Sequence, residues 1–330
     1  MASFSPFSAP SPNPRAHSGW SSVLSSRGSP QVAGAAAHPL LLLLQGGLGN
    51  QLFQVVLAST LAAQHGRELV VDPVLLQSRL RRLRGVTPRR LSPLLAGRLP
   101  LVATPWHHRA AVRLAARWRR TAAAWVLTDA ALERAAAAGA LPQGLGAIRL
   151  LHTHATHPAL YGPSFQPAWE DLAAALEPLR SGPPPALALH VRRGDYLKPR
   201  SGFFPLEPGY YRRALELIEA SPALAARAGL GGASRPMLHL FTDDPAWCST
   251  HLGDAGWDLR VEAGSPEQDL ARLASARVLI TSNSSFSAVA AHLIRLKDPA
   301  SLVLCPDRWL LEEDGRLGDL RSPDWLAVEA

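Results

Sequence analysis

The stretch Ala186-Leu187-Ala188-Leu189-His190-Val191-Arg192-Arg193-Gly194-Asp195-Tyr196 decides the fold. It follows a proline-rich loop and predicts a buried strand that ends in two arginines, a glycine and an aspartate. Ligands of open α/β sheets bind at the carboxyl ends of strands. Two arginines there can form bidentate, charge-assisted bonds with phosphate oxygens. The alternative is an exposed Arg–Asp turn, which contributes little.

Apolar strand patterns and helical patterns alternate on both sides of this stretch, which predicts an α/β fold with parallel sheets. Residues 1–38 are rich in Ser, Pro, Ala and Gly, and we expect them to form a disordered tail. We expect an N-terminal domain at 39–181 and a C-terminal domain at 182–330. The section 74–141 is expected to be helical. Expected strands are 40–44, 68–71, 147–152, 186–191, 237–241, 261–262, 277–281 and 301–305; expected helices are 51–65, 169–179, 210–220, 267–274 and 286–296.

The net charge of +8 predicts an acidic partner such as a nucleotide phosphate, anionic lipid or nucleic acid. Only Lys198 and Lys297 are lysines, so codon bias toward arginine accounts for part of the excess. The segment 73–128 holds twelve arginines, three tryptophans and no acidic residue. This composition suits contact with an anionic membrane face, although an ordinary solvated helical face is the simpler interpretation. No nucleic-acid-binding module accompanies the charge, so we expect no nucleic acid partner.

Cysteine use and hydropathy indicate the compartment. Cys248 and Cys305 form no disulfide framework and are expected to be small core residues in a reducing environment. The longest clean apolar run, 39–44, falls far short of the ~20 residues of a membrane span. We therefore expect a cytoplasmic protein, peripheral at the inner membrane face.

The segment 152–157 contains His152, His154 and His157 in an HxHxxH spacing. This spacing raises the question of a zinc site, but no carboxylate or cysteine completes the set in the sequence. A polar strand end is the favoured interpretation.

Glycine-rich sequence opens the first expected helix. Gly46, Gly47 and Gly49 allow close backbone approach to a ligand, and a helix N-terminus favours anions. A tight strand–helix turn explains these glycines equally well. The polar residues Asn50 and Gln51 follow at the top of the sheet and could hydrogen-bond a sugar hydroxyl.

Polar groups follow two further strands. The pair Asp243-Asp244 could accept bonds from a base or ribose, act as acid and base, or bind a metal, and it is also a good N-cap for a helix near Pro245. The segment Ser282-Asn283-Ser284-Ser285-Phe286-Ser287 could form a phosphate cradle at a helix start or cap that helix.

These motifs, in this order, resemble glycosyltransferase family 11, the α-1,2-fucosyltransferases. The resemblance spans about residues 40–310 and also includes Cys305-Pro306-Asp307-Arg308-Trp309. It implies a GT-B architecture, with two Rossmann-like domains facing each other across a cleft. The implied reaction is an inverting transfer of L-fucose from GDP-β-L-fucose to a sugar hydroxyl, commonly O2 of galactose, with no cofactor and no bound metal.

The resemblance also implies roles for individual residues. Arg192 would grip the diphosphate and Arg193 would support it, Ser284 and Ser285 would contact the phosphates, and His190 would approach the nucleotide. Asp243 would contact the guanine or ribose. Inversion normally requires a base to take the acceptor proton, and Asp195 and Glu207 are candidates by their location in the sequence. We therefore predict Arg192, Asp195 and Asn50 as catalytic, and His190, Arg193, Asp243, Ser284, Ser285, Gly47 and Gly49 as substrate-binding.

The expected partners are GDP-fucose and a galactose-containing glycan or lipid-linked oligosaccharide. Family members usually carry an aromatic pair where this chain has Ala288-Val289. Two alternatives therefore remain: a glycosyltransferase that uses another GDP-sugar, and a non-catalytic protein that binds a nucleotide sugar or a glycan.

Overall fold

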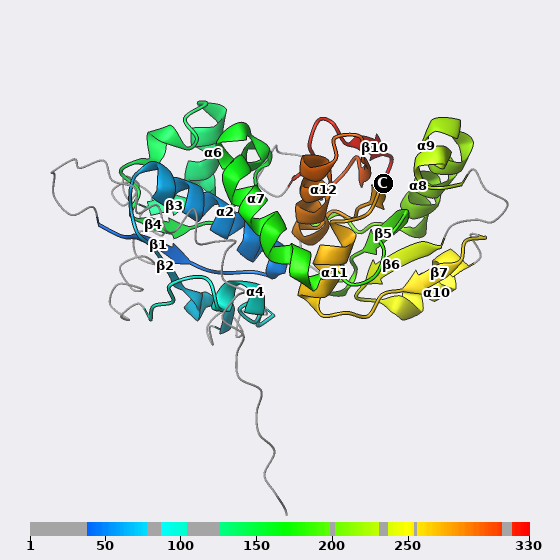
Figure 1. Cartoon of the computed structure of the whole chain (residues 1–330), viewed down its shortest axis with the longest axis horizontal. Helices are drawn as coiled ribbons and strands as arrows, with labels where there is room; N and C mark the ends of the chain where they lie inside the picture. Colours follow the sequence, from blue (N-terminus) through cyan, green and yellow to red (C-terminus); the bar gives the residue numbers. More distant parts are fainter. Residues whose placement is uncertain are drawn as a thin grey trace, which may run out of the picture.

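The computed structural model describes residues 38–77, 87–103, 126–198, 202–230, 237–253, 256–311 and 319–330. These residues form two parallel β-sheets, one in the N-terminal half and one in the C-terminal half of the chain (Figure 1). The expected disordered tail lies outside the described residues, as does most of the arginine-rich segment. The membrane-face prediction for that segment therefore stays a prediction.

The N-terminal sheet has the strand order β2-β1-β4-β3, with every pair parallel. The chain moves outward from β1 to β2 and later returns on the other side of β1, so a topological switch point lies between β1 and β4. Its elements are β1 (Leu40–Leu43), α2 (Leu48–Gln64), β2 (Leu69–Asp72), α4 (Pro93–Ala96), β3 (Val126–Thr128), α6 (Asp129–Ala137), β4 (Leu150–His152) and α7 (Gln166–Leu176).

The C-terminal sheet has the strand order β7-β6-β5-β8-β9-β10, again with every pair parallel. Counted from β5, this is the doubly wound Rossmann order 3-2-1-4-5-6, whose switch point lies between β5 and β8. Its elements are β5 (Leu187–Val191), α8 (Pro208–Ala220), α9 (Pro222–Arg227), β6 (Leu238–Thr242), α10 (Pro245–Leu252), β7 (Leu259–Val261), α11 (Pro266–Leu273), β8 (Val278–Ile280), α12 (Ser285–Lys297), β9 (Leu302–Pro306) and β10 (Leu326–Val328).

The predicted fold class is confirmed: the protein is α/β, with two Rossmann-like parallel-sheet halves. All five residues of β5 are buried, as expected of a central parallel strand. Short 3-10 turns connect the elements at Pro73–Gln77, Gln143–Leu145, Pro158–Tyr161, Pro163–Phe165, Glu177–Leu179 and Gly194–Leu197. None of the described helices is both long and apolar enough to cross a bilayer.

Three expectations about individual elements were wrong. Helix α2 begins at Leu48 rather than near Gln51, because Gly47 has the extended backbone of an N-cap residue. The section 74–141 was expected to be helical but contains the strand β3. The strand β10 was not expected, since only Val328 of its residues is buried and an edge strand with two exposed residues lacks a clear apolar pattern.

One hydrophobic cluster spans both halves. Helix α2 of the first half packs along α12 of the second, where Leu52 and Phe53 belong to the same buried cluster as Val289 and Leu293 (Figure 1). A Cβ atom on Gly49 would lie 2.4 Å from the backbone nitrogen of Phe286, so glycine is what lets the two helices approach at this point. The halves are therefore held together by packed helices, and the predicted division near residue 182 stays a prediction.

Candidate functional site

A cavity of about 1230 Å³ lies where the two switch points face each other. Its walls come from loops at the carboxyl ends of strands in both sheets, as expected for ligand sites of parallel α/β folds. The N-terminal half contributes Gly46, Gly47, Gly49, Asn50, Arg89, Asp129, His154 and Thr156, and the C-terminal half contributes His190, Arg192, Asp195, Tyr196, Lys198, Asp243, Ser284, Ser285 and Phe286. Nine of the ten residues predicted from the sequence line this cavity.

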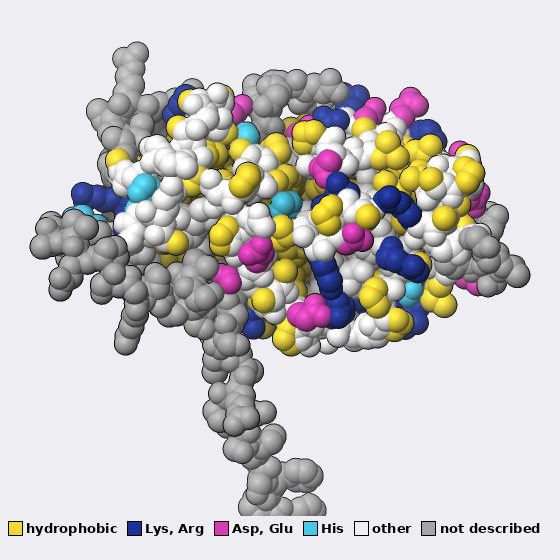
Figure 2. Space-filling model, turned by 45° about the horizontal axis from the view of Figure 1, so that its top comes forward, with side chains coloured by type: hydrophobic (Ala, Val, Ile, Leu, Met, Phe, Trp, Pro, Cys, Tyr) yellow, Lys and Arg dark blue, Asp and Glu magenta, His cyan; other side chains and the backbone are white. Residues whose placement is uncertain are grey.

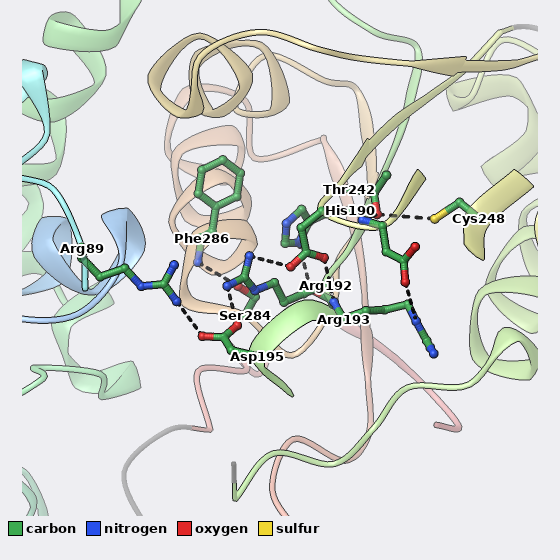
Figure 3. A network of polar contacts seen from close by, with 12 residues as sticks. Arg89, His190, Arg192, Arg193, Asp195, Thr242, Cys248, Ser284 and Phe286 are labelled. Atoms are coloured by element: carbon green, nitrogen blue, oxygen red, sulfur yellow. Dashed lines mark hydrogen bonds and ion pairs between the residues drawn. The ribbon is translucent and has the colours of Figure 1, made fainter. Parts of the chain in front are cut away.

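Arg192 lies at the centre of a charged network on the C-terminal wall (Figure 3). Its Nη1 lies 2.8 Å from Asp243 Oδ2, and its Nη2 donates to Asp195 Oδ1 over 2.5 Å. Asp195 Oδ2 in turn accepts a bond of 2.6 Å from Arg89, which reaches across from the N-terminal half. A guanidinium has five N–H donors, so these two contacts leave others that can meet phosphate oxygens.

Arg193 is the one of these ten residues that does not line the cavity. Its guanidinium lies over the Trp247 ring, 3.8 Å from the centroid, and its Nε is 3.5 Å from Asp244 Oδ2. Only its backbone nitrogen joins the network, donating to Asp243 Oδ1 over 2.9 Å. The structure therefore separates two adjacent arginines that the sequence presents as a pair.

The adjacent aspartates Asp243 and Asp244 have different contacts. Asp244 caps α10, since its side chain accepts from Trp247 N over 3.1 Å, which confirms the predicted cap. Asp243 instead turns toward Arg192 and packs against Gly194, where a Cβ atom would lie 2.5 Å from the carboxylate. Gly194 is thus required for the approach of Asp243 to the arginine turn.

The serine-rich loop after β8 begins α12 at the cavity. Ser284 caps the helix, with its Oγ accepting from Phe286 N over 3.3 Å, as predicted. The first turn of α12 contains no acidic residue, so the positive end of its helix dipole is free to meet an anion. Asn283 fixes the loop from behind by donating to the carbonyl oxygens of Phe204 and Trp309.

His190 bridges the C-terminal switch point. Its Nδ1 lies 2.8 Å from the Ser282 hydroxyl on the opposite side, and its ring packs against Phe286. Burial lowers the pKa of His190 to about 3, with a smaller effect from the charge of Arg192. It is therefore neutral across the physiological range and can hydrogen-bond a ligand without carrying charge.

Helix α2 points its first turn into the same cavity from the N-terminal half. Gly46 has a φ of +84°, in the region that favours glycine. A Cβ atom there would lie 2.6 Å from Asn50 Nδ2, so the amide of Asn50 folds closely over the glycine turn. Gly47 supplies no side chain to cap the helix, which leaves its first N–H groups directed at the cavity.

Asp129 and His154 form a second polar group in the cavity that sequence reasoning missed. His154 Nδ1 lies 3.0 Å from Asp129 Oδ2. Asp129 directly follows β3 and His154 comes two residues after the end of β4, but their pairing depends on β3, which was not expected. Arg89, Tyr196 and Lys198 also line the cavity without having been singled out as site residues. Glu207, a predicted base, is exposed at the N-cap of α8 and is not among the cavity residues.

The structure also places the metal and core candidates. His157 caps a short turn by accepting from Ala159 N, and burial lowers its pKa, with a weaker opposing effect of Glu133. Within the described residues, no group of three or more His, Cys, Asp or Glu side chains is arranged to hold a metal ion. Cys248 and Cys305 are free and buried, which confirms their prediction as core residues.

Charged side chains are unevenly distributed on the face shown in Figure 2. Lys and Arg side chains gather over the C-terminal half, on the right of the view, with Asp and Glu side chains between them. The network around Arg192 shows the same mixture at close range, with two carboxylates beside the guanidinium. Positive charge near the cavity is therefore partly balanced by carboxylates.

Comparison with known proteins adds structural likeness alone. No protein-family model and no curated protein matches the chain. Similar solved structures include an arginine-to-lysine mutant of FUT1 from Arabidopsis thaliana with GDP (10% identity, 84% of this chain and 73% of that chain, TM-score 0.40). They also include heptosyltransferase WaaC of E. coli with ADP (12%, 88% and 93%, 0.43) and the α-1,6-fucosyltransferase NodZ from Bradyrhizobium (14%, 77% and 93%, 0.41). At these scores the likeness carries no argument, and the fold assignment rests on strand order.

Proposed function

We propose that the chain is an inverting, nucleotide-sugar-dependent glycosyltransferase that moves L-fucose from GDP-β-L-fucose to a hydroxyl, commonly O2, of a terminal galactoside. The observation that carries the proposal is the cavity between two switch points. Arg192 and the first turn of α12 flank the switch point of the C-terminal sheet. This arrangement fits the diphosphate of a donor, because guanidinium and helix N-terminus both favour phosphate oxygens. The identity of the donor, with fucose as its sugar and guanine as its nucleobase, comes from the motif resemblance.

The chemistry follows from where charge develops. As the acceptor oxygen bonds to the anomeric carbon, the bond from that carbon to the diphosphate breaks and its electrons move to the departing GDP. Arg192 and the first N–H groups of α12 would stabilise that charge more in the transition state than in the ground state. In this proposal these groups supply the positive charge that a divalent metal supplies in other transferases.

The donor site is tested by calorimetry with GDP, GMP and GDP-fucose in EDTA. We expect GDP to bind and Arg192→Ala to weaken that binding by roughly 10- to 100-fold, the value of charged hydrogen bonds. Arg212→Ala is the matched control, since Arg212 is exposed on α8 and bonds to His251 O. Wild-type GDP affinity in Arg192→Ala would show that this arginine does not hold the diphosphate.

Turnover separates the proposal from its alternatives. GDP release from GDP-fucose in the presence of galactosides, and none from GDP-mannose, supports a fucosyltransferase. Release from GDP-mannose alone indicates another GDP-sugar. Tight GDP binding without turnover of any donor indicates a binding protein. Absence of GDP binding overturns the assignment of the cavity as a donor site.

A further inference from the structure

A histidine–carboxylate pair stands at the switch point of the N-terminal sheet, on the cavity wall away from Arg192. Strands β3 and β4 are neighbours, with Thr128 paired to His152 at their last residues. Asp129 follows the first strand and His154 the second, so the sheet register brings them together. Both side chains line the cavity, and about two fifths of the His154 side chain is exposed, at 41%.

The contacts of Asp129 determine which ring nitrogen of neutral His154 carries the lone pair. Asp129 Oδ1 accepts from the Thr153 hydroxyl at 2.5 Å and from His154 N at 2.7 Å. Burial alone would raise the pKa of Asp129, but hydrogen bonds and charge from His154, with the bond from Thr153, lower it overall. An ionised carboxylate only accepts, so Nδ1 must be the donor over the 3.0 Å contact. Neutral His154 therefore carries its lone pair on Nε2.

The backbone beside the histidine is held in an uncommon conformation. Ala155 has a φ of +55°. Among the described residues, it is the single residue other than glycine with a positive φ. Thr153 supports this turn by accepting from Ala155 N over 2.9 Å while donating to Asp129. Such strained conformations cluster at functional sites, where surrounding bonds enforce them.

We propose that His154 is the general base of the transfer, and that Asp129 is the residue that positions it; this rests on the proposed function. In the step, the acceptor O–H gives its proton to His154 Nε2. The acceptor oxygen forms its bond to the anomeric carbon, and the bond from that carbon to the diphosphate breaks, with its electron pair leaving on GDP. Asp129 keeps Nδ1 protonated and stabilises the imidazolium that forms.

Other groups in the cavity are less suited to this role. His190 is neutral and buried, with its Nδ1 bonded to Ser282, and its pKa of about 3 makes it a poor base. Both oxygens of Asp195 already accept from arginines, Arg192 and Arg89. Asp243 is likewise bonded to Arg192 and to the backbone of Arg193, and Asp269 accepts from Gly264 N. The remaining charged group among the cavity residues is Lys198, which is a cation.

The test uses the full chain with the variants His154→Gln, Asp129→Asn and Asp129→Glu. The control is His251→Gln, because the His251 ring stacks on Trp247 and His251 is not among the cavity residues. We measure kcat for transfer between pH 5 and 9 and the GDP dissociation constant of each variant. We expect His154→Gln to lower kcat roughly 100-fold or more and to remove the acidic limb of the pH profile, with GDP affinity unchanged.

Asp129→Asn is expected to lower kcat at unchanged GDP affinity, and Asp129→Glu to restore part of the loss, as a merely structural residue would not. Wild-type kcat and pH profile in His154→Gln overturn the base assignment. A wild-type chain that binds no GDP or transfers no fucose overturns the proposed function instead, so the two failures are distinguishable. Because His154 is partly exposed, its replacement is expected to leave the fold intact, which the unchanged GDP affinity and thermal unfolding check.

Discussion

At the C-terminal switch point, Arg192 and the first turn of α12 flank the crevice. At the N-terminal switch point, the first turn of α2 faces the Asp129–His154 pair. Both walls are built from strand ends of parallel sheets, yet one presents Arg192 beside a helix N-terminus and the other an imidazole oriented by a carboxylate. The comparison shows that the backbone plan fixes where cavity-lining groups stand, whereas the side chains after each strand differ between the walls. In our proposals this difference makes one wall bind phosphate and the other accept a proton.

The two walls also differ in how their polar groups are held. On the C-terminal wall, carboxylates of Asp195 and Asp243 already occupy donors of Arg192. On the N-terminal wall, Asp129 holds one ring nitrogen of His154, and both residues line the cavity. The guanidinium of Arg192 is thus shared between two carboxylates and keeps further N–H donors, whereas the imidazole of His154 is held through one ring nitrogen.

The largest expected effect comes from breaking the contact that holds the walls together. In Gly49→Ala, the new Cβ would lie 2.4 Å from the backbone of Phe286 and Ser285, which cannot move aside as a side chain can. We expect a loss of about 3 kcal/mol in the free energy of unfolding, the upper part of the usual range for overpacking. Urea denaturation measures it.

The matched control is Gly47→Ala in the same turn, where a Cβ atom meets nothing within 4 Å. Its expected cost is below about 1 kcal/mol, from the poorer N-cap. If the two alanine variants were equally stable, the close contact between α2 and α12 would not be what holds the halves together.

Acid should also weaken the packing between the two halves, at a second contact that involves His292. This histidine of α12 stacks on Tyr161 of the N-terminal half, with ring centroids 4.5 Å apart. Burial lowers its pKa from 6.5 to about 4, against a smaller raising effect of Asp324. Below pH 6.5 the unfolded chain binds a proton that the folded chain refuses, so stability is lost as the pH falls from 6.5 toward 4.

At pH 5 the loss from His292 amounts to roughly 2 kcal/mol relative to pH 7. We expect His292→Phe, which keeps an aromatic ring on Tyr161, to show a correspondingly smaller difference in unfolding free energy between the two pH values. His190 titrates in the same direction in both proteins and therefore cancels in the comparison. Identical differences for the wild type and His292→Phe would contradict this account.

Much of the C-terminal wall could be predicted from the sequence because its chemistry is local. An apolar strand that is followed by Arg192, and a serine run at the start of α12, place the groups proposed to bind phosphate within a few residues of each strand end. Sequence could not separate Arg192 from Arg193, because the Arg193 side chain packs on Trp247 of α10 whereas Arg192 pairs with Asp195 and Asp243.

The N-terminal wall was harder to predict because its key pair is joined through the sheet. Asp129 and His154 are 25 residues apart. They meet only because β3 and β4 lie side by side in register. The strand β3 has three residues and follows an arginine-rich segment, so its pattern was taken for helix. Without that strand, no carboxylate could be assigned to the histidine.

The smallest expected effect is on GDP affinity and concerns Arg89, through which the N-terminal half would contribute charge to the proposed donor site. Arg89 crosses the cavity to Asp195 over 2.6 Å, but both side chains are about one third exposed, at 31% and 30%. An ion pair of that exposure contributes up to about 1 kcal/mol. We therefore expect Arg89→Ala to change the GDP dissociation constant by less than about fivefold, with a smaller change at 0.5 M salt than at 0.05 M, values chosen for their screening lengths.

The control is Arg90→Ala, because Arg90 is an exposed neighbour that is not among the cavity residues. A loss in Arg89→Ala as large as that of Arg192→Ala would mean that both walls hold the diphosphate, and the division between a phosphate wall and a proton-accepting wall would have to be given up.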